Sequence, residues 1–150
     1  MKYTCEVIID KPRDEVIKAF DNPDNMKYWQ KGFVSFEHVS GEPGKPGAES
    51  IIKYDFGKRK MELIETITFR NLPDEFHGNY QTKGVVNIQK NYFKEENGKT
   101  RWTSEAEFKF SGFMKIMVFF MGKKPFKKQT QSFMDDFKAF AEGNPKYGTE

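Results

Sequence analysis

The pattern of apolar and polar positions divides the chain into a long alternating part and a final third with the period of a helix. From Ser111 to Glu142, apolar side chains recur at spacings of four and three, until Gly143-Asn144-Pro145 supplies a helix stop. The positions in register are Phe126, Thr130, Phe133, Phe137 and Phe140. They form one stripe along a single C-terminal helix, which is expected to lie across a wide apolar surface.

The chain before Phe110 has the pattern of a sheet with two short helices near its start. A half-buried first strand is predicted from the alternating positions Tyr3, Cys5, Val7 and Ile9. Pro12 suits the first turn of a helix capped by Asp10 or Lys11. Asn22-Pro23-Asp24 ends that helix and begins a second one that carries Trp29.

A second strand, about Phe33 to Val39, ends at a glycine-rich segment, residues 41–47. That segment lacks the Gly-Lys-Ser/Thr ending of a phosphate-binding loop and no helical pattern follows it, so it is predicted to be a turn. From Ala48 to Phe110 the chain reads as a strand meander. Its turns are predicted at Gly57-Lys58, Asn71-Leu72-Pro73-Asp74, Lys83-Gly84 and Asn97-Gly98. The chain has no repeat or linker, so residues 1–150 are expected to form one domain, with 143–150 as a loose tail.

The two hairpin turns predict which side chains face the helix. A two-residue loop at Asn97-Gly98 pairs Glu96 with Lys99 and turns one set of side chains inward. That set is Asn87, Gln89, Asn91, Phe93, Trp102, Ser104, Ala106, Phe108 and Phe110. The Gly57-Lys58 hairpin adds Ser50, Ile52, Tyr54, Met61, Leu63 and Glu65. Opposite-charge pairs then occupy the outer face.

The inward face is therefore apolar but interrupted by polar groups. An unpaired buried amide costs about 1–3 kcal/mol, so a dry core disfavours Glu65, Asn87 and Gln89 at these positions. These side chains instead favour a cavity that holds water or a ligand, in which Asn87→Leu would cost little stability. Alternatively, β-bulges turn these groups outward, or the groups satisfy one another.

Composition supports an adaptable interior. Aromatic residues make up 16% of the chain, while leucine occurs only at Leu63 and Leu72. Rings and methionines adapt to a guest more readily than a leucine core does, although a ring-rich core without a guest has the same composition. The formal net charge of +3, from 25 basic and 22 acidic residues, does not favour nucleic acid as a partner.

The same features predict a cytoplasmic protein. A single cysteine, Cys5, excludes an internal disulfide and fits a reducing compartment. The first ten residues have no continuous apolar run, unlike a signal peptide. The longest apolar run, Phe113 to Met121, contains Lys115 and is too short to span a bilayer.

Few residues carry a recognisable chemistry. His38 and His77 lack neighbours at metal-ligand spacing and are expected to be exposed and non-catalytic, so no metal or cofactor is predicted. Glu65 is the best acid–base candidate, since a water-poor cavity keeps a carboxyl protonated. Tyr54, Tyr80 or Asn87 could orient a carbonyl or hydroxyl group beside it.

The segment Lys109 to Lys128 is aromatic and basic, with no acidic residue. Gly122 and Pro125 are expected to interrupt the helix there. Two interpretations remain open: a kinked, buried segment with solvated lysines, which we favour, or a surface that docks on a membrane or a partner protein.

The order of predicted elements resembles the helix-grip fold of the START-like (SRPBCC) superfamily, which includes polyketide cyclase/dehydrase-like, lipid-transfer and Bet v 1-like proteins. The resemblance spans nearly the whole chain and rests on the following segments: Asp10-Lys11-Pro12, Asn22-Pro23-Asp24 to Trp29, Gly44 to Ala48, Thr100-Arg101-Trp102 to Phe108, and Phe126 to Thr130 followed by Phe137 to Glu142. It implies an α+β fold in which a curved antiparallel sheet of about seven strands wraps around a long C-terminal helix. It also implies a hydrophobic cavity but carries over no catalytic set.

Three functional hypotheses follow. The first is the binding of a hydrophobic or amphipathic small molecule, lipid- or polyketide-like, between the sheet and the C-terminal helix. The second is a cyclase or dehydratase that uses the same cavity, and the third is a co-chaperone-like or membrane-docking module. The sequence does not predict an oligomeric state. The residues expected to line the cavity are Tyr54, Met61, Leu63, Glu65, Tyr80, Asn87, Gln89, Asn91, Trp102, Ser104, Phe108, Met117, Met121, Phe126, Phe133 and Phe137.

Overall fold

The secondary structure follows the predicted order of strand, short helices, meander and C-terminal helices. The computed structural model describes residues 1–149. Its strands are β1 (Lys2–Ile9), β2 (Phe33–Ser40), β3 (Glu49–Asp55), β4 (Lys60–Asn71), β5 (Glu75–Thr82), β6 (Val85–Glu96) and β7 (Lys99–Phe110). Its helices are α1 (Arg13–Phe20), the 3₁₀ turn η1 (Pro23–Asn25), α2 (Met26–Trp29), α3 (Phe113–Met121) and α4 (Lys124–Ala141).

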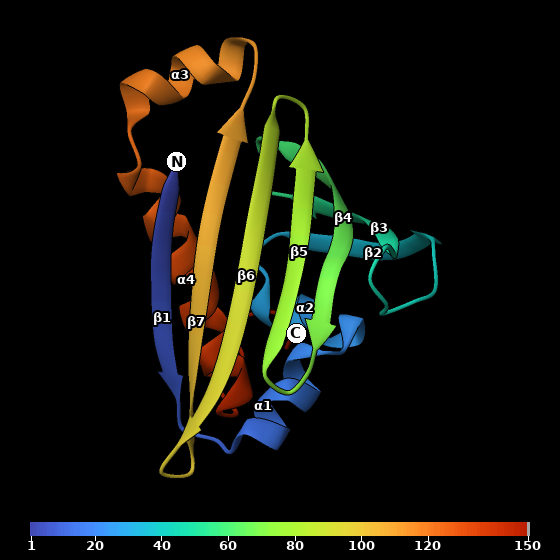
Figure 1. Ribbon diagram of the computed structural model, residues 1–150, viewed down its shortest axis with the longest axis vertical. Helices are drawn as coiled ribbons and strands as arrows, with labels where there is room; N and C mark the ends of the chain where they lie inside the picture. The colour runs from blue at the N-terminus through green and yellow to red at the C-terminus, as the bar shows by residue number, and fades with distance from the viewer. Residues whose placement is uncertain (150) are drawn as a thin grey trace.

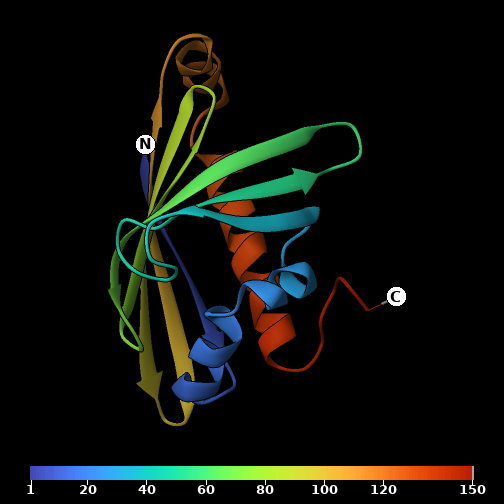
Figure 2. The same cartoon turned by 90° about the vertical axis from the view of Figure 1, so that its right-hand side faces the viewer.

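The strands form one antiparallel, seven-stranded sheet in the order β1-β7-β6-β5-β4-β3-β2. Figure 1 shows β1, β7 and β6 side by side, with α4 behind them. In Figure 2 the sheet is strongly curved: β2, β3 and β4 project away from β6 and β7, and α4 runs between the two parts. This is the expected α+β arrangement. The sheet face toward α4 is called the inner face below.

The hairpin registers predicted from the sequence are confirmed. Glu96 pairs with Lys99 across the β6–β7 turn, and the β3–β4 hairpin also keeps its predicted pairing. Asn97 and Gly98 have φ angles of 54° and 78°, the left-handed conformation that a two-residue hairpin turn of this type requires. Because side chains alternate between the faces of a strand, this register places every inward residue of both hairpins on the inner face.

The start of α1 differs from the predicted cap at Asp10 or Lys11. The N-cap residue is Pro12, whose side chain makes no capping hydrogen bond. Instead, the backbone N–H of Arg13 donates to the carboxylate of Glu95 on β6, at 2.9 Å. The acceptor comes from a residue far away in sequence, so no local pattern could indicate it.

The final third of the chain is two helices, α3 of 9 residues and α4 of 18 residues, rather than one. The interruption lies where it was predicted: Gly122 has a φ of 76°, and Pro125 sits in the first turn of α4, where a missing N–H costs nothing. The preference for a buried segment is wrong, however. Phe119 and Phe120 on α3 are each 82% exposed.

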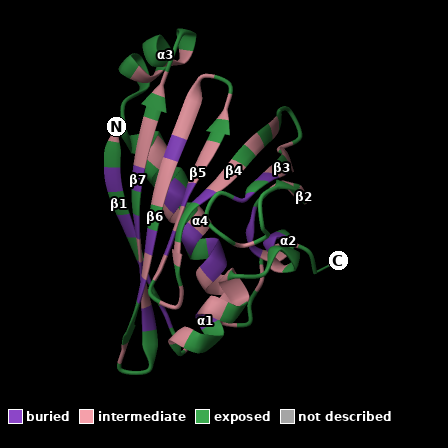
Figure 3. Ribbon diagram, turned by 45° about the vertical axis from the view of Figure 1, so that its right-hand side comes forward, coloured by how far each residue is buried: buried purple, intermediate pink, exposed green. Residues whose placement is uncertain are grey.

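The closed core lies where α1, α2 and the C-terminal half of α4 meet the inner face (Figure 3). Phe20 on α1 is central to it. The Phe20 ring contacts the rings of Trp29, Phe76, Phe93, Trp102 and Phe137, with centroid distances from 5.1 to 6.3 Å. Aromatic rings thus form a connected group within this core, as the composition indicated.

Helix α4 is attached along the edge strand β1. The Tyr3 hydroxyl lies 2.7 Å from Thr130 Oγ1 and donates to the carbonyl oxygen of Phe126 at 3.0 Å. Burial raises the pKa of Tyr3 to about 12. Further along, Lys138 Nζ donates to the carbonyl oxygen of Ile8 at 2.7 Å. These bonds set the position of α4 over the sheet.

Part of the C-terminal tail, expected to be loose, is anchored to α4. The Tyr147 hydroxyl donates to Asp136 Oδ2 at 2.8 Å, and Lys146 Nζ lies 2.9 Å from Asp136 Oδ1. Asp136 is only 6% exposed, and a carboxylate at such a position needs charged or hydrogen-bonding partners. Of the expected tail, only Glu150 lies outside the described residues.

Candidate functional site

A row of polar side chains crosses the inner face at one level. Strand pairing places Ser50 on β3 beside Glu65 on β4, Glu65 beside Tyr80 on β5, and Tyr80 beside Asn87 on β6. We call these four residues the polar row. Phe108 on β7 continues it, opposite Asn87. The observed pairings, of which the sequence predicted those within the β3–β4 and β6–β7 hairpins, bring together residues from four strands that lie far apart in the sequence.

Glu65 is the acidic residue of the polar row. Burial raises the pKa of its carboxyl, while hydrogen bonding with Tyr80 acts in the opposite direction. Burial also raises the pKa of the Tyr80 hydroxyl well above its usual value, with the nearby Glu65 charge as a further cause. The pair thus favours a protonated carboxyl beside a neutral phenol.

Gly78 makes room for Tyr80 on the inner face. A Cβ atom at Gly78 would lie 3.4 Å from the Tyr80 hydroxyl oxygen and 3.3 Å from the carbonyl oxygen of Thr66. The Tyr80 side chain therefore lies over the glycine of its own strand. A side chain larger than a methyl group at residue 78 would therefore crowd the phenol.

Tyr54 approaches the same carboxyl from β3. Its hydroxyl donates to Gln30 Oε1 at 2.6 Å, and Gln30, at the end of α2, is 5% exposed. Burial, followed by the charge of Glu65, raises the pKa of Tyr54. The two phenols and the carboxyl therefore form one electrostatically coupled group, Tyr54, Glu65 and Tyr80.

The amides of the inner face satisfy one another, which is one of the alternatives left open by the sequence. Asn87 Nδ2 donates to the carbonyl oxygen of Glu107 at 3.2 Å, and Gln89 Nε2 donates to Asn87 Oδ1 at 2.9 Å. The Ser104 hydroxyl donates to Gln89 Oε1 at 2.7 Å. Trp102 Nε1 likewise donates to Asn91 Oδ1 at 2.9 Å. These amides consequently need no water or ligand to be paired.

An aromatic group lies beside the polar row, near the start of α4. The rings of Phe108 and Phe110 stack with centroids 5.8 Å apart, and Phe126 of α4 packs against both at 5.2 and 5.4 Å. Phe133, further along α4 on the same stripe, contacts Trp29 at 4.7 Å. The phenylalanines remain half-exposed, so they present apolar surface next to the polar groups.

Helix α4 covers only part of the inner face. It contacts β1 along its length, and its rings reach β7 through Phe126 and Phe137. Four inner side chains of β4 and β5 stay half-exposed, namely Met61, Leu63, Glu65 and Tyr80, whereas Ile67 and Phe76 on the same strands are buried. The chain exposes 9270 Å², against about 7,900 Å² expected for a compact monomer of this mass. The excess agrees with an incompletely covered inner face.

The residues predicted to line a cavity divide into three groups. Those on the incompletely covered part are Tyr54, Met61, Leu63, Glu65, Tyr80, Gln89, Phe108, Phe126 and Phe133, with Asn87 at 9% exposure beside them. Those in closely packed surroundings, at 5% exposure or less, are Asn91, Trp102, Ser104 and Phe137. Met117 and Met121 belong to neither set, because they lie on α3 with 41% and 49% exposure.

Three residues near the candidate site were missing from the predicted set. Gln30 holds the Tyr54 hydroxyl, Ser50 begins the polar row, and Phe110 completes the aromatic group. The hairpin register placed Ser50 and Phe110 inward, which was a usable signal. Gln30 is brought in by the packing of α2 and has no comparable signal in the sequence.

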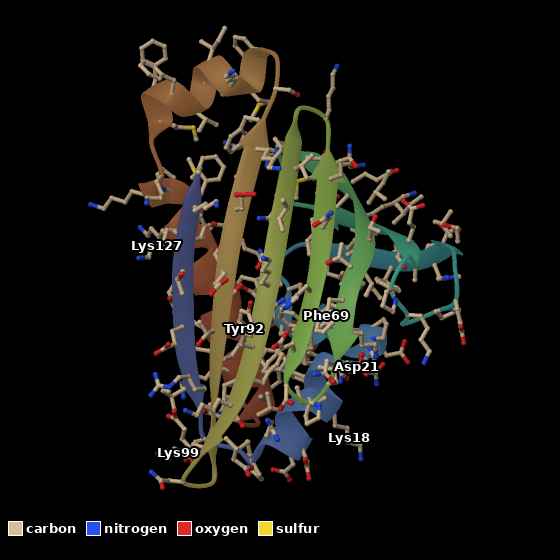
Figure 4. The ribbon with its side chains drawn as sticks, viewed as in Figure 1. Lys18, Asp21, Phe69, Tyr92, Lys99 and Lys127 are labelled. Atoms are coloured by element: carbon tan, nitrogen blue, oxygen red, sulfur yellow. The ribbon has the colours of Figure 1, made fainter. Side chains whose placement is uncertain are left out.

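The histidines do not contribute to this site. His38 is exposed on β2. His77 lies on the outer face, but it is not exposed as expected: its side chain is only 12% exposed because the rings of Phe69 and Tyr92 lie against it at 5.3 and 5.1 Å. Figure 4 shows Phe69 and Tyr92 on that outer face. Among residues 1–149, no cluster of three or more histidine, cysteine or acidic side chains has the arrangement of a metal site.

Two hollows on the surface lie outside the polar row. One, of about 380 Å³, is lined by residues of α1 and its neighbourhood, including Lys11, Lys18 and Asn25. The other, of about 370 Å³, lies at the β3–β4 hairpin and is lined by Tyr54 and Met61 of the predicted set together with Lys53 and Glu62. Neither hollow is lined by Glu65 or Tyr80, so neither reaches the polar row.

Comparison with known proteins identifies the fold. The sequence matches no protein-family model and no curated protein sequence. Solved structures, however, match over nearly the whole chain. Ara h 8.0201 has a TM-score of 0.76 at 13% identity, covering 96% of this chain and 99% of its own. A protein from Thermus thermophilus has a TM-score of 0.75 at 13% identity, covering 94% of this chain and 97% of its own.

An enzyme is also among the similar structures. The norcoclaurine synthase of Thalictrum flavum, solved as a point mutant in complex with a transition-state analogue, has a TM-score of 0.68 at 10% identity. The match covers 94% of this chain and 93% of the synthase. The protein therefore has a Bet v 1-like helix-grip fold, the fold that its sequence pattern suggested. The TM-scores establish the fold, whereas sequence identities this low carry over no residue roles.

Proposed function

We propose that the protein binds a hydrophobic or amphipathic small molecule, lipid- or polyketide-like, between the inner face and α4. The apolar part of such a ligand would lie against the half-exposed rings of Phe108, Phe110, Phe126 and Phe133. Its polar part would meet Glu65 and Tyr80. Pockets of this kind combine apolar walls with a few placed polar groups.

The observation that carries the proposal is the position of Glu65. Its carboxyl is held on the inner face with a raised pKa, and it is not part of the amide network that satisfies Asn87 and Gln89. A carboxyl in such surroundings gains from a partner that accepts its proton in a hydrogen bond. A ligand carbonyl, hydroxyl or carboxyl group would provide that partner.

The proposal is tested by native mass spectrometry of protein purified without detergent, followed by binding measurements with fatty acids and polycyclic phenols. We expect an adduct or binding from this panel, and we expect Glu65→Gln and Tyr80→Phe each to weaken binding by about tenfold, as for the loss of a hydrogen bond in a desolvated site.

Glu62→Gln is the matched control, because Glu62 lies on the same strand but points into solvent on the outer face. It should leave binding unchanged. A chain that carries no adduct and binds no member of the panel would contradict the proposal. Equal weakening by Glu62→Gln would show that the carboxyl at position 65 has no special role.

A cyclase or dehydratase activity on a ring-forming substrate is a second candidate. The specific observation is that a carboxyl whose pKa is raised by burial, Glu65, lies beside two phenols of raised pKa, Tyr54 and Tyr80. Such a group could donate a proton to a leaving hydroxyl, or accept one from a carbon next to a carbonyl. The norcoclaurine synthase match shows that the same fold can carry an enzyme.

The enzymatic proposal requires the chemistry of Glu65 rather than its polarity alone. Once a substrate is identified, Glu65→Gln should lower kcat by about 10²-fold or more while binding weakens far less. If Glu65→Gln and Tyr80→Phe both turn over that substrate at the normal rate, the protein uses this site for binding only.

A further inference from the structure

Helix α3 presents its apolar side chains to solvent. Phe113 is 73% exposed, Phe119 and Phe120 are each 82% exposed, and Ile116 is 58% exposed. The helix has 9 residues, of which only Lys115 is polar. A group of exposed rings this dense is unusual for the free surface of a protein and marks an interaction site.

The attachment of α3 explains why these rings stay outside the core. The helix follows β7 and lies at the end of the molecule beside the β5–β6 turn (Figures 1 and 2). The Ser111 N–H donates to the carbonyl oxygen of Gly84 at 3.0 Å, and a Cβ atom at Gly84 would lie 3.0 Å from Met114 Cγ. Met114 and Val118 face the protein, and the other apolar residues project away from it.

The charge around α3 has one sign. From Phe108 to Met134 the chain has no acidic residue. The lysines of this stretch are Lys109, Lys115, Lys123, Lys124, Lys127 and Lys128. Those that follow α3 lie at the start of α4, where Figure 4 shows Lys127 beside the edge strand β1. Exposed rings are thus combined with positive charge, and among the residues that the structure describes only Lys109 of these six lysines has an acidic partner, Glu107 at 3.9 Å.

We propose that α3 docks the protein on a lipid bilayer that contains anionic lipids. Rings and methionines of α3 would enter the interfacial layer, while the surrounding lysines meet the negatively charged headgroups. The helix would lie on the bilayer, because 9 residues extend only about 14 Å and a bilayer core is about 30 Å thick. None of the helices in residues 1–149 has the length and apolarity of a membrane span.

A second copy of the chain fits this surface less well. Pairing two α3 helices would bring two sets of lysines together without any acid between them. A stable dimer also buries about 800 Å² on each partner, which is more than one short helix offers. An anionic membrane satisfies both the apolar and the charged part of the surface.

Flotation with phosphatidylcholine vesicles, with and without about 30% phosphatidylserine, tests this proposal. We expect the wild-type chain to float with the anionic vesicles and to be released as sodium chloride rises from about 0.1 to 0.5 M. F119S/F120S and K115E/K124E should each reduce the bound fraction by about tenfold or more. All four side chains are exposed, so the fold should be retained, which far-UV circular dichroism verifies.

Two controls carry the same chemical changes elsewhere. V34S removes an exposed apolar side chain on β2, and K45E/K58E reverses two exposed charges in loops. Both should float like the wild type. Failure to float, or flotation that neither salt nor the α3 variants change, would overturn the proposal. So would a wild-type dimer in sedimentation that F119S/F120S dissociates without any vesicle binding, because α3 would then pair with a second copy.

Discussion

Glu65 places a carboxyl group on the inner face, where burial disfavours its charged form. A carboxyl with a pKa raised by burial destabilises the folded protein when it is ionised. Stability from this group is therefore fully present below the usual pKa near 4.5 and is lost as pH rises through the raised, folded-state pKa.

We predict that Glu65→Gln removes this loss of stability at higher pH. The free energy of unfolding of the variant should exceed that of the wild type by an amount that grows as pH rises above 4.5. The growth should reach about 1.4 kcal/mol for each unit by which the folded-state pKa is raised. Urea denaturation between about pH 4 and 8 measures this difference, because in this range the carboxyl ionises at lower pH in the unfolded chain than in the folded protein. Glu62→Gln, in solvent, should follow the wild type; a pH-independent difference for Glu65→Gln would contradict the assignment.

Asn87 gives a second test at the same scale. Replacing it with leucine leaves Gln89 Nε2 and the carbonyl oxygen of Glu107 without their partner. The expectation that Asn87→Leu costs little assumed an unpaired amide, and the observed network reverses it. We now predict a loss of about 1–3 kcal/mol in the free energy of unfolding, measured by chemical denaturation.

Gln81→Leu provides the comparison for Asn87→Leu. Gln81 is exposed on β5, so the same type of change there should alter stability by no more than about 0.5 kcal/mol. A variant at position 87 as stable as the wild type would mean that the amide network contributes nothing and that water already serves these groups.

Among the elements, α4 and α3 differ in whether their apolar side chains are buried. Helix α4 buries its stripe and is tied to β1 by polar bonds, whereas α3 leaves its rings outside. The difference follows from position, because α4 lies within the curve of the sheet and α3 lies beyond the end of β7 (Figure 2). Amphipathic pattern alone does not distinguish these two situations.

A double-mutant cycle tests the hydrogen bond between Tyr3 and Thr130 that attaches α4 to β1. Tyr3→Phe and Thr130→Val should each cost about 1 kcal/mol, since each removes one partner of a buried hydroxyl pair. The double variant should cost less than the sum by at least about 0.5 kcal/mol. Tyr92→Phe, on the outer face, should have little effect. Strict additivity would show that the 2.7 Å contact between Tyr3 and Thr130 does not contribute to stability.

At the scale of the whole molecule, the core joins both ends of the chain. Its buried cluster extends from Tyr3 and Cys5 on β1 to Met134 and Phe137 on α4, and it includes both Trp29 and Trp102. The sheet is continuous from β1 to β2. We therefore propose that residues 1–150 form a single cooperative unit.

Denaturation tests this unit. Tryptophan fluorescence reports on the core and far-UV circular dichroism reports largely on the sheet, and we predict one transition with the same midpoint for both. Two midpoints would show that the projecting strands β2, β3 and β4 unfold apart from the core, and the single-domain proposal would then be wrong.

The sequence by itself determined the order of the elements, the hairpin registers and the inner position of Glu65, Asn87 and Gln89. These features depend on residues close together in the chain: a two-residue turn such as Asn97-Gly98 imposes the pairing of its strands, and the two-residue period then assigns every side chain to a face. The order of these elements resembled the helix-grip fold, which the similar solved structures confirm.

Only the tertiary structure decided which hydrogen-bond partners the polar side chains have. The Gln30 partner of Tyr54, the Glu95 carboxylate at the start of α1 and the Tyr147 anchor on Asp136 all depend on how separate elements pack together. The same holds for the exposure of α3, because an apolar helix is buried only if another element lies within reach to cover it. The pairing of polar side chains and the burial of an apolar helix depend on distances between separate elements. Those distances are set only once the chain has folded.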